Sequence, residues 1–156
     1  MTPQPRDPVG APYVDTGVLL SLFLNDTGFP AAEQWFLDQG NSPPWVSHRA
    51  LVEFAGLVSL CVRRGELTEA RAAAVHAEFE CFRRERLQLL EPRGTDFLQA
   101  RLWLQELARL PLRSGDALHL AIARRERLIL ITADRLLIRA AAALGLDHQA
   151  IRNALM

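Results

Sequence analysis

Four acidic residues of this sequence stand where carboxylates could act together. Asp15 directly follows a short apolar stretch, and Asp134 comes two residues after a second one. Asp116 is expected in the first turn of a helix, and Glu53 inside another helix. Two or more carboxylates that converge at one cleft, without a suitable His cluster, bind hard divalent cations such as Mg²⁺ or Mn²⁺. A site of this kind orients water against a phosphodiester, so the indicated chemistry is phosphate-ester hydrolysis.

Each acid also has a purely structural interpretation. Asp15 and Asp134 could cap helices, and Asp116 could be a first-turn carboxylate that the helix dipole favours. Glu53 is harder to explain in this way, because its neighbours in the helix are mostly apolar. A charge in such a place is costly unless a partner or a metal ion meets it. A position on the polar edge of the helix stays open for Glu53.

Composition restricts the possible chemistry further. The chain has 156 residues, 18 basic and 18 acidic, and every basic residue is Arg. Lysine chemistry is therefore excluded, including Schiff bases and Walker-type phosphate binding. The zero net charge argues against binding nucleic acid by bulk charge alone, so any such role must come from a site. Without the four acids, the remaining side chains carry a mild positive excess.

The length predicts a single α/β domain. Apolar and turn patterns predict strands near 13–14, 45–46, 87–90, 128–131 and 146–149, and helices near 18–24, 31–38, 48–64, 67–84, 95–107, 114–125 and 134–144. The stretch 128–131 is apolar throughout, which is typical of a strand covered on both faces. We expect a three-layer α/β/α sandwich around a small, mainly parallel sheet. Ligands of such sheets bind beyond the carboxyl ends of the strands, where the acids are expected.

The ends of the domain and its compartment also follow from composition. Residues 1–12 contain four prolines and form a leader that we expect to be loosely ordered, before one domain over 13–156. No secretory or membrane-spanning segment is recognisable, so we expect a cytoplasmic protein without a membrane partner. Cys61 and Cys81 are expected to be reduced, buried thiols.

Four sequence blocks resemble the PIN-domain ribonucleases, and among them the VapC-type toxins of toxin–antitoxin pairs. The blocks follow the family's order along almost the whole chain: Tyr13-Val14-Asp15-Thr16-Gly17-Val18-Leu19-Leu20, Val52-Glu53-Phe54, Ser114-Gly115-Asp116-Ala117-Leu118-His119-Leu120-Ala121-Ile122-Ala123 and Leu130-Ile131-Thr132-Ala133-Asp134. None of the four acids is replaced. Two departures are the late position of the first acid, after the leader, and Gly17 where the family often has Ser, Asn or Ala.

The resemblance implies a PIN-like fold and a metal-dependent endoribonuclease that uses Mg²⁺ or Mn²⁺. Asp15 and Asp116 then resemble the principal metal ligands, and all four acids would form the catalytic pocket. Glu53 and Asp134 would complete this pocket directly or through metal-bound water.

Other residues in or beside these blocks have a supporting interpretation. Thr16 and Thr132 match small hydroxyl residues that could position water or hold the acids, although either could be only a helix cap. Arg113 and Arg135 would lie near the rim and could contact RNA phosphates, unless they are ordinary surface residues. His119 is expected to pack or form hydrogen bonds rather than carry protons.

The resemblance also implies partners: an RNA substrate, a small VapB-type antitoxin and a second copy of the chain in a homodimer. Two alternatives remain at this point, a housekeeping PIN nuclease of RNA processing and a non-catalytic PIN-like module that binds RNA or protein. A haloacid-dehalogenase-like phosphatase would need a second Asp at position 17 and a later Lys, and a response-regulator receiver would also need a Lys. The sequence has neither the second Asp nor a Lys.

Overall fold

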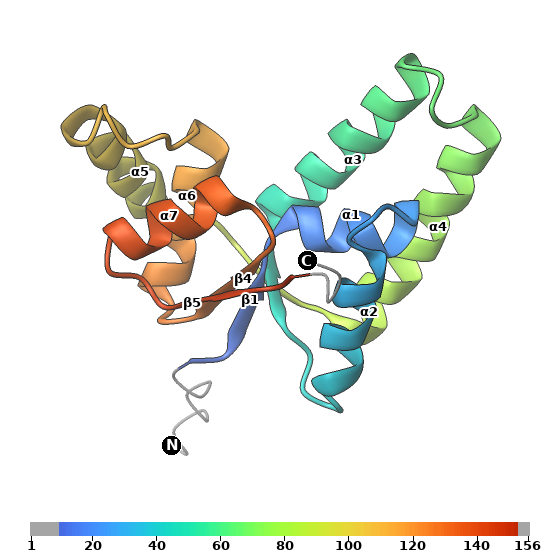
Figure 1. Cartoon of the computed structure of the whole chain (residues 1–156), viewed down its shortest axis with the longest axis horizontal. Helices are drawn as coiled ribbons and strands as arrows, with labels where there is room; N and C mark the ends of the chain where they lie inside the picture. Colours follow the sequence, from blue (N-terminus) through green and yellow to red (C-terminus); the bar gives the residue numbers. More distant parts are fainter. Residues whose placement is uncertain (1–9, 153–156) are drawn as a thin grey trace.

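A five-stranded parallel sheet forms the centre of the chain (Figure 1). The structure, a computed structural model, describes residues 10–152. The strands are β1 (Pro12–Val14), β2 (Trp45–Ser47), β3 (Gln88–Leu90), β4 (Ile129–Thr132) and β5 (His148–Ala150). The helices are α1 (Thr16–Leu24), α2 (Phe29–Asp38), α3 (His48–Arg63), α4 (Glu69–Arg86), α5 (Gly94–Glu106), α6 (Ser114–Arg125) and α7 (Arg135–Ala143).

The strand order places β1 in the middle of the sheet. The order is β3-β2-β1-β4-β5, so the chain first winds outward from β1 to β3 and then returns to the other side of β1. This reversal between β1 and β4 is a topological switch point, and ligands of open α/β sheets bind beyond the carboxyl ends of the strands at such a point. Asp15 and Asp134 follow these two strands.

Alternating side chains of the central strands divide the core into two layers. Val14 and Ile131 pack with α1, α2, α3 and α4 on one face of the sheet. Tyr13 and Leu130 point the other way and pack with α6, α7 and Trp103 of α5. Side chains alternate between faces along a strand, so two neighbouring strands with two apolar faces require helices on both sides. The predicted α/β/α sandwich is confirmed, with every strand pair parallel.

Most predicted elements are present, and the differences lie at their ends. Helices α1 and α2 begin two residues earlier than the apolar pattern indicated, and β5 is displaced toward the C-terminus. Gly10 already donates a backbone hydrogen bond to the Arg127 carbonyl, so order begins before residue 13; residues 1–9 of the expected leader lie outside the described part. The prediction that both cysteines are buried was wrong, because Cys81 on α4 is exposed and Cys61 on α3 is only partly buried.

Within residues 10–152, no helix is both long enough and apolar enough to cross a membrane.

Candidate active site

Asp15 and Thr132 join the ends of the two central strands. Asp15 is 9% exposed and occupies the N-cap position of α1, but its side chain makes no capping hydrogen bond. Instead, its Oδ2 accepts a hydrogen bond of 2.9 Å from the Thr132 hydroxyl. The same hydroxyl oxygen accepts from the Asp134 backbone N–H at 3.0 Å. Thr132, which is fully buried, therefore fixes the Asp15 carboxylate against the turn that carries Asp134.

Asp134 has the structural role that its sequence position allowed. Its Oδ1 caps α7 by accepting from the backbone N–H groups of Leu136 at 2.8 Å and Leu137 at 3.3 Å. Both bonds end on the same carboxylate oxygen. Capping satisfies donors that every helix start leaves open, and it keeps a negative charge at the positive end of the helix dipole. Asp134 is thus a fixed charge beside Asp15.

Asp116 is half-buried in the first turn of α6 and lies within electrostatic reach of these two acids. Burial raises the pKa of the Asp116 carboxyl, and the charges of Asp15 and Asp134 raise it further, although His119 and Arg113 act in the opposite direction. Burial likewise raises the pKa of Asp15; His119 and the Thr132 hydroxyl oppose this increase, and the charges of Glu53 and Asp134 add to it. The fold therefore gathers carboxylates that repel one another.

Glu53 enters the site from α3 and is held by two partners. Its Oε1 lies 2.5 Å from Nε2 of His119, which is fully buried on α6, and 3.2 Å from Nε of Arg49 one helical turn earlier. Burial alone would raise the pKa of Glu53, but the hydrogen bond from His119, the charge of His119 and the charge of Arg49 together lower it. The cost of a charge in this apolar helix is thus offset by protein partners.

Arg49 lies directly against the backbone of α6. A Cβ atom at Gly115 would clash with the guanidinium group of Arg49, so glycine at this position makes room for the arginine. The Arg49 side chain is 35% exposed, whereas its Nε is buried and lacks a hydrogen bond of good geometry within residues 10–152. Arg49 and His119 thereby connect the helices of the two layers above the carboxyl edge of the sheet.

The donor set fits a divalent cation in its chemistry. Hard carboxylate oxygens that raise one another's pKa values are stabilised by a nearby dication. The Thr16 hydroxyl, next to Asp15, is buried with no hydrogen-bond partner in the described residues. However, no group of three or more acidic, histidine or cysteine side chains within 10–152 is arranged to hold one metal ion. A cation that is bound by one or two carboxylates and keeps several waters does not need such a group.

The two arginines expected at the rim are both exposed, and each lies within three residues of an acid in the sequence. Arg113 occupies the N-cap position of α6, and its charge lowers the pKa of Asp116. Arg135 is the first residue of α7, directly after Asp134. Both side chains are thus available to an anionic ligand.

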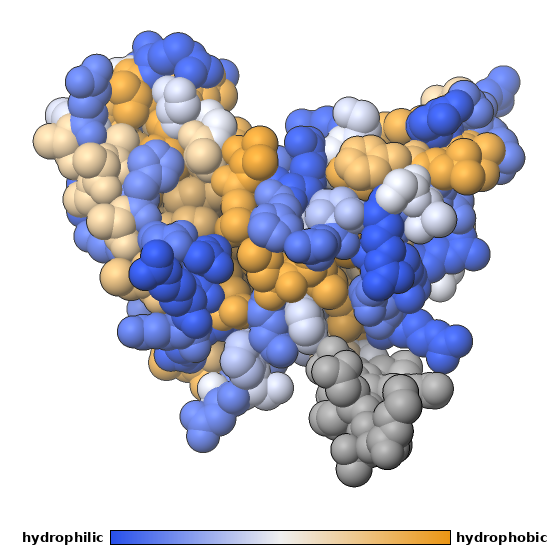
Figure 2. All heavy atoms as spheres, turned by 180° about the vertical axis from the view of Figure 1, so that it is seen from behind, coloured by the Kyte–Doolittle hydropathy of each residue, from blue (hydrophilic) through white to orange (hydrophobic). Residues whose placement is uncertain are grey.

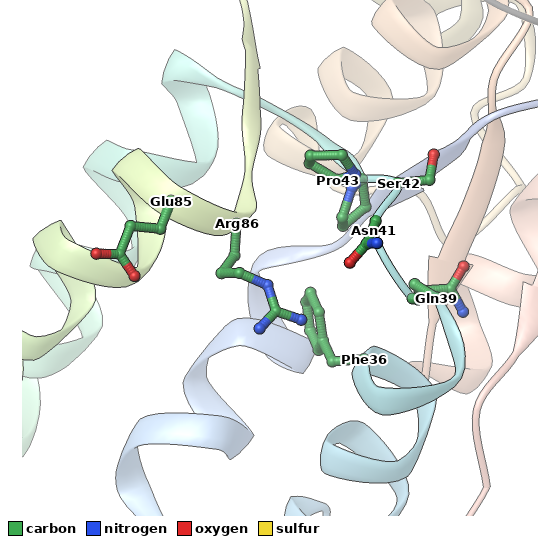
Figure 3. A pocket seen from close by; sticks show the side chains of 9 residues that line it. Phe36, Gln39, Asn41, Ser42, Pro43, Glu85 and Arg86 are labelled. Carbon is green, nitrogen blue, oxygen red and sulfur yellow. The ribbon is translucent and has the colours of Figure 1, made fainter.

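The molecular surface is hollowed between the two groups of helices, as the space-filling view shows (Figure 2). A pocket of about 310 Å³ lies elsewhere, against Phe36, the segment 39–44, Glu85 and Arg86 (Figure 3). Its residues precede β2 and β3, so it lies toward the amino ends of these strands. Because the acids follow the carboxyl ends, this pocket is not the acidic site.

Sequence reasoning did not identify the partners of Glu53. Ser47 lies directly before α3, at a position where a serine often caps a helix. It does occupy the N-cap position, but its side chain makes no capping bond and instead accepts a hydrogen bond from Tyr13. Arg49 was not singled out, although its position four residues before Glu53 is a spacing that pairs charges on a helix. The contact of His119 with Glu53 spans 66 residues of sequence and has no local signal.

The fold, together with the acids at the carboxyl edge of the sheet, defines a class of protein. It is a doubly wound α/β domain with a carboxylate site at its switch point. The family model described as the PIN domain matches residues 13–143. The chain therefore belongs to the PIN-domain family, as its sequence blocks indicated.

Solved structures share this fold at low sequence identity. A chain of DNA-bound VapBC from Salmonella typhimurium has a TM-score of 0.69 and 18% identity, with 90% of this chain and 98% of that chain covered. VapC20 of Mycobacterium tuberculosis, a toxin that cleaves the Sarcin-Ricin loop, has a TM-score of 0.66 and 20% identity, with 83% of this chain and 95% of that chain covered. A chain of VapBC2 from Rickettsia felis, bound to a fragment of promoter DNA, has a TM-score of 0.66 and 16% identity, with 91% of this chain and 99% of that chain covered. No curated protein matches the chain.

Proposed function

We propose that this chain is a Mg²⁺- or Mn²⁺-dependent endoribonuclease that hydrolyses RNA phosphodiester bonds. The observation that carries the proposal is the gathering of Asp15, Asp116 and Asp134 at the carboxyl edge of the sheet. Burial, and after it the charges of neighbouring carboxylates, raises the pKa values of Asp15 and Asp116 there. Carboxylates held together in this way destabilise the protein unless positive charge meets them. A divalent cation supplies such charge, and it can also activate water for hydrolysis.

Asp15 and Asp116 are the residues that would hold the cation. Asp15 is oriented by Thr132, and Asp116 is projected from the first turn of α6. Asp134 keeps its position by capping α7 and adds negative charge from the far side. When bound, a dication activates water and stabilises charge on the phosphate oxygens. Glu53, whose pKa is lowered by His119 and Arg49, would accept a hydrogen bond from water in the site.

The substrate would meet positive charge at the rim. Arg113 and Arg135 are both exposed beside acids of the cleft, where each could contact a backbone phosphate. A contact of this kind positions the strand without reading its sequence.

The decisive experiment is cleavage of a mixed RNA panel by the purified chain. The panel contains tRNA and ribosomal stem-loops, with Mg²⁺ or Mn²⁺, and the controls are EDTA and Asp116→Asn. We expect metal-dependent cleavage that both controls abolish. A folded wild-type chain that cleaves no more than Asp116→Asn would contradict the nuclease and favour a non-catalytic binding module.

We also propose that the chain is the toxin of a type II toxin–antitoxin pair. The support is the fold shared with chains of VapBC complexes. A small VapB-type antitoxin would then cover the acidic cleft, and an arginine of the antitoxin could compete with metal for the carboxylates. Expression of the chain alone should arrest growth, and coexpression with the product of an adjacent small gene should relieve the arrest. Growth unaffected by an active nuclease would favour a housekeeping role in RNA processing.

A homodimer is part of the same proposal. Val52 and Leu57 on α3 are 66% and 39% exposed, so this helix has apolar surface that a second copy could cover. Light scattering should give twice the 17.5 kDa mass of the chain. A mass of one chain at working concentration would contradict the dimer.

A further inference from the structure

A chain of hydrogen bonds runs through the core and ends on Glu53. The Tyr13 hydroxyl lies 2.9 Å from Ser47 Oγ and 2.6 Å from His119 Nδ1. On the other side of the imidazole ring, Nε2 lies 2.5 Å from Glu53 Oε1. Four elements, β1, β2, α6 and α3, contribute one residue each.

The donors and acceptors of this hydrogen-bond network can be assigned in few ways, and each of them orients Glu53. The Tyr13 hydroxyl donates to Ser47 Oγ and lies beside Nδ1 of His119. The pKa of Glu53 is lowered, so its carboxylate is ionised and can only accept. His119 must then donate from Nε2, because a carboxylate has no proton to offer it. Glu53 therefore always receives a hydrogen bond from His119.

The members of this hydrogen-bond network behind Glu53 are fully buried. Tyr13, Ser47 and His119 are each 0% exposed, whereas the Glu53 side chain is 22% exposed. Buried polar networks are costly unless every member is satisfied, and apolar side chains of similar shape could fill the same space. Glu53 is the point at which this network reaches the site. The contacts from His119 and Arg49 both end on Oε1, so one oxygen is fixed, and among residues 10–152 no partner occupies Oε2, which is left for a ligand.

We propose that Tyr13 and His119 are positioning residues that hold Glu53 in its catalytic orientation. Ser47 anchors the far end of this chain, and Arg49 restrains Glu53 from the solvent side. The inference rests on the proposed nuclease function, because it assigns a role to residues behind one of its acids. Partners that orient an acidic or ligating residue from behind commonly change activity by about 10- to 100-fold when they are removed.

A double-mutant cycle tests this coupling. Tyr13→Phe removes one hydroxyl and keeps the ring, and we expect it to lower kcat by about tenfold with KM unchanged. Glu53→Gln should lower kcat further. If Tyr13 acts through Glu53, adding Tyr13→Phe to Glu53→Gln should produce no further loss. Independent losses that multiply would overturn the proposal, because a purely structural role predicts them.

Two additional variants keep the cycle interpretable. His148→Gln changes a histidine of β5 whose ring forms a hydrogen bond with the Leu146 carbonyl, and it should leave kcat within twofold of wild type. Ser47→Ala perturbs the far end of the hydrogen-bond chain and replaces Tyr13→Phe if that variant does not fold. It should show the same lack of additivity with Glu53→Gln.

A second measurement does not depend on RNA cleavage. Nuclear magnetic resonance of chain labelled with nitrogen-15 in histidine should show a low-field proton on His119 Nε2. Both Glu53→Gln and Tyr13→Phe should shift the ring signals of His119, and the signals of His76 and His148 should stay in place. Unchanged His119 signals would overturn the positioning network. Shifted signals in a chain that cleaves no RNA would support the network and contradict the nuclease.

Discussion

The Thr132 hydroxyl donates to the Asp15 carboxylate across the boundary between β4 and β1. The donor and acceptor are 2.9 Å apart and both residues are buried, although 117 positions separate them in the sequence. The same oxygen accepts from the Asp134 N–H. One threonine therefore fixes two of the acids relative to each other. It does so at the switch point of the sheet, where a ligand of this fold would bind.

Thr132→Val should destabilise the protein because it keeps the shape of the side chain and removes the hydroxyl. The Asp15 carboxylate then loses its donor and the Asp134 N–H loses its acceptor. Groups left unsatisfied in this way cost about 1–3 kcal/mol. Urea unfolding should show this loss in the free energy of unfolding. Thr132→Ser is the control, since it keeps both hydrogen bonds and loses only a methyl group, worth about 0.8 kcal/mol. Equal losses in the two variants would contradict the role of the hydroxyl.

Asp116→Asn should stabilise the metal-free protein, and the gain should depend on pH. The folded-state pKa of Asp116 is raised above its ordinary value of 3.8, so the folded state binds more protons than the unfolded state as this group titrates. Its contribution to stability therefore falls as pH rises from about 4 through the raised pKa. Asparagine has no such titration. The stability advantage of the variant should be largest at neutral pH and should shrink toward pH 4.

The measurement for Asp116 is urea unfolding of wild type and variant at several pH values with a chelator present. A constant difference between the two proteins across this range would show that the pKa of Asp116 is not raised in the folded state. Added Mg²⁺ should reverse the order, because a cation that binds only the folded wild type stabilises it by mass action.

The acids were accessible to sequence reasoning because their neighbours carry local signals. Asp15 and Asp134 end apolar stretches that had to be buried strands, and Asp116 begins an apolar helix, so parallel packing placed all three at one edge of the sheet. The capping of α7 by Asp134 was also predictable, because capping involves residues two and three positions away.

The surroundings of Glu53 depend on tertiary packing and could not be predicted in the same way. The apolar helix around Glu53 indicated that a partner was needed, but it did not indicate which one. His119 reaches Glu53 only because α3 and α6, on opposite faces of the sheet, meet above its carboxyl edge. For Ser47, the local pattern predicts a contact that the structure does not contain. Its position predicted a helix cap, and a buried tyrosine 34 residues away uses its side chain instead.

Two glycines of the same helical hairpin should respond to alanine in opposite directions. Gly56 lies inside α3, and a Cβ there would meet nothing within 4 Å. Gly56→Ala should stabilise the protein by about 0.5–1 kcal/mol, because glycine costs entropy inside a helix. Gly65 follows α3 with φ +74°, a left-handed conformation that costs other residues about 1–2 kcal/mol. Gly65→Ala should therefore destabilise. Thermal unfolding of both variants checks the contrast, and a shift of the same sign in both would contradict it.

Arg113→Gln and Arg135→Gln should each weaken RNA binding and make it less sensitive to salt. Each arginine that neutralises one phosphate releases counterions, which contributes about 0.7 to the slope of log K against log salt concentration for single strands. Fluorescence anisotropy with a labelled single-stranded RNA, in the Asp116→Asn background to prevent cleavage, measures this slope. Arg63→Gln is the matched control, because Arg63 lies at the C-terminal end of α3 and donates to Ser59. An unchanged slope in the two rim variants would mean that the RNA follows another path, whereas a loss shared by all three variants would indicate only the change in net charge.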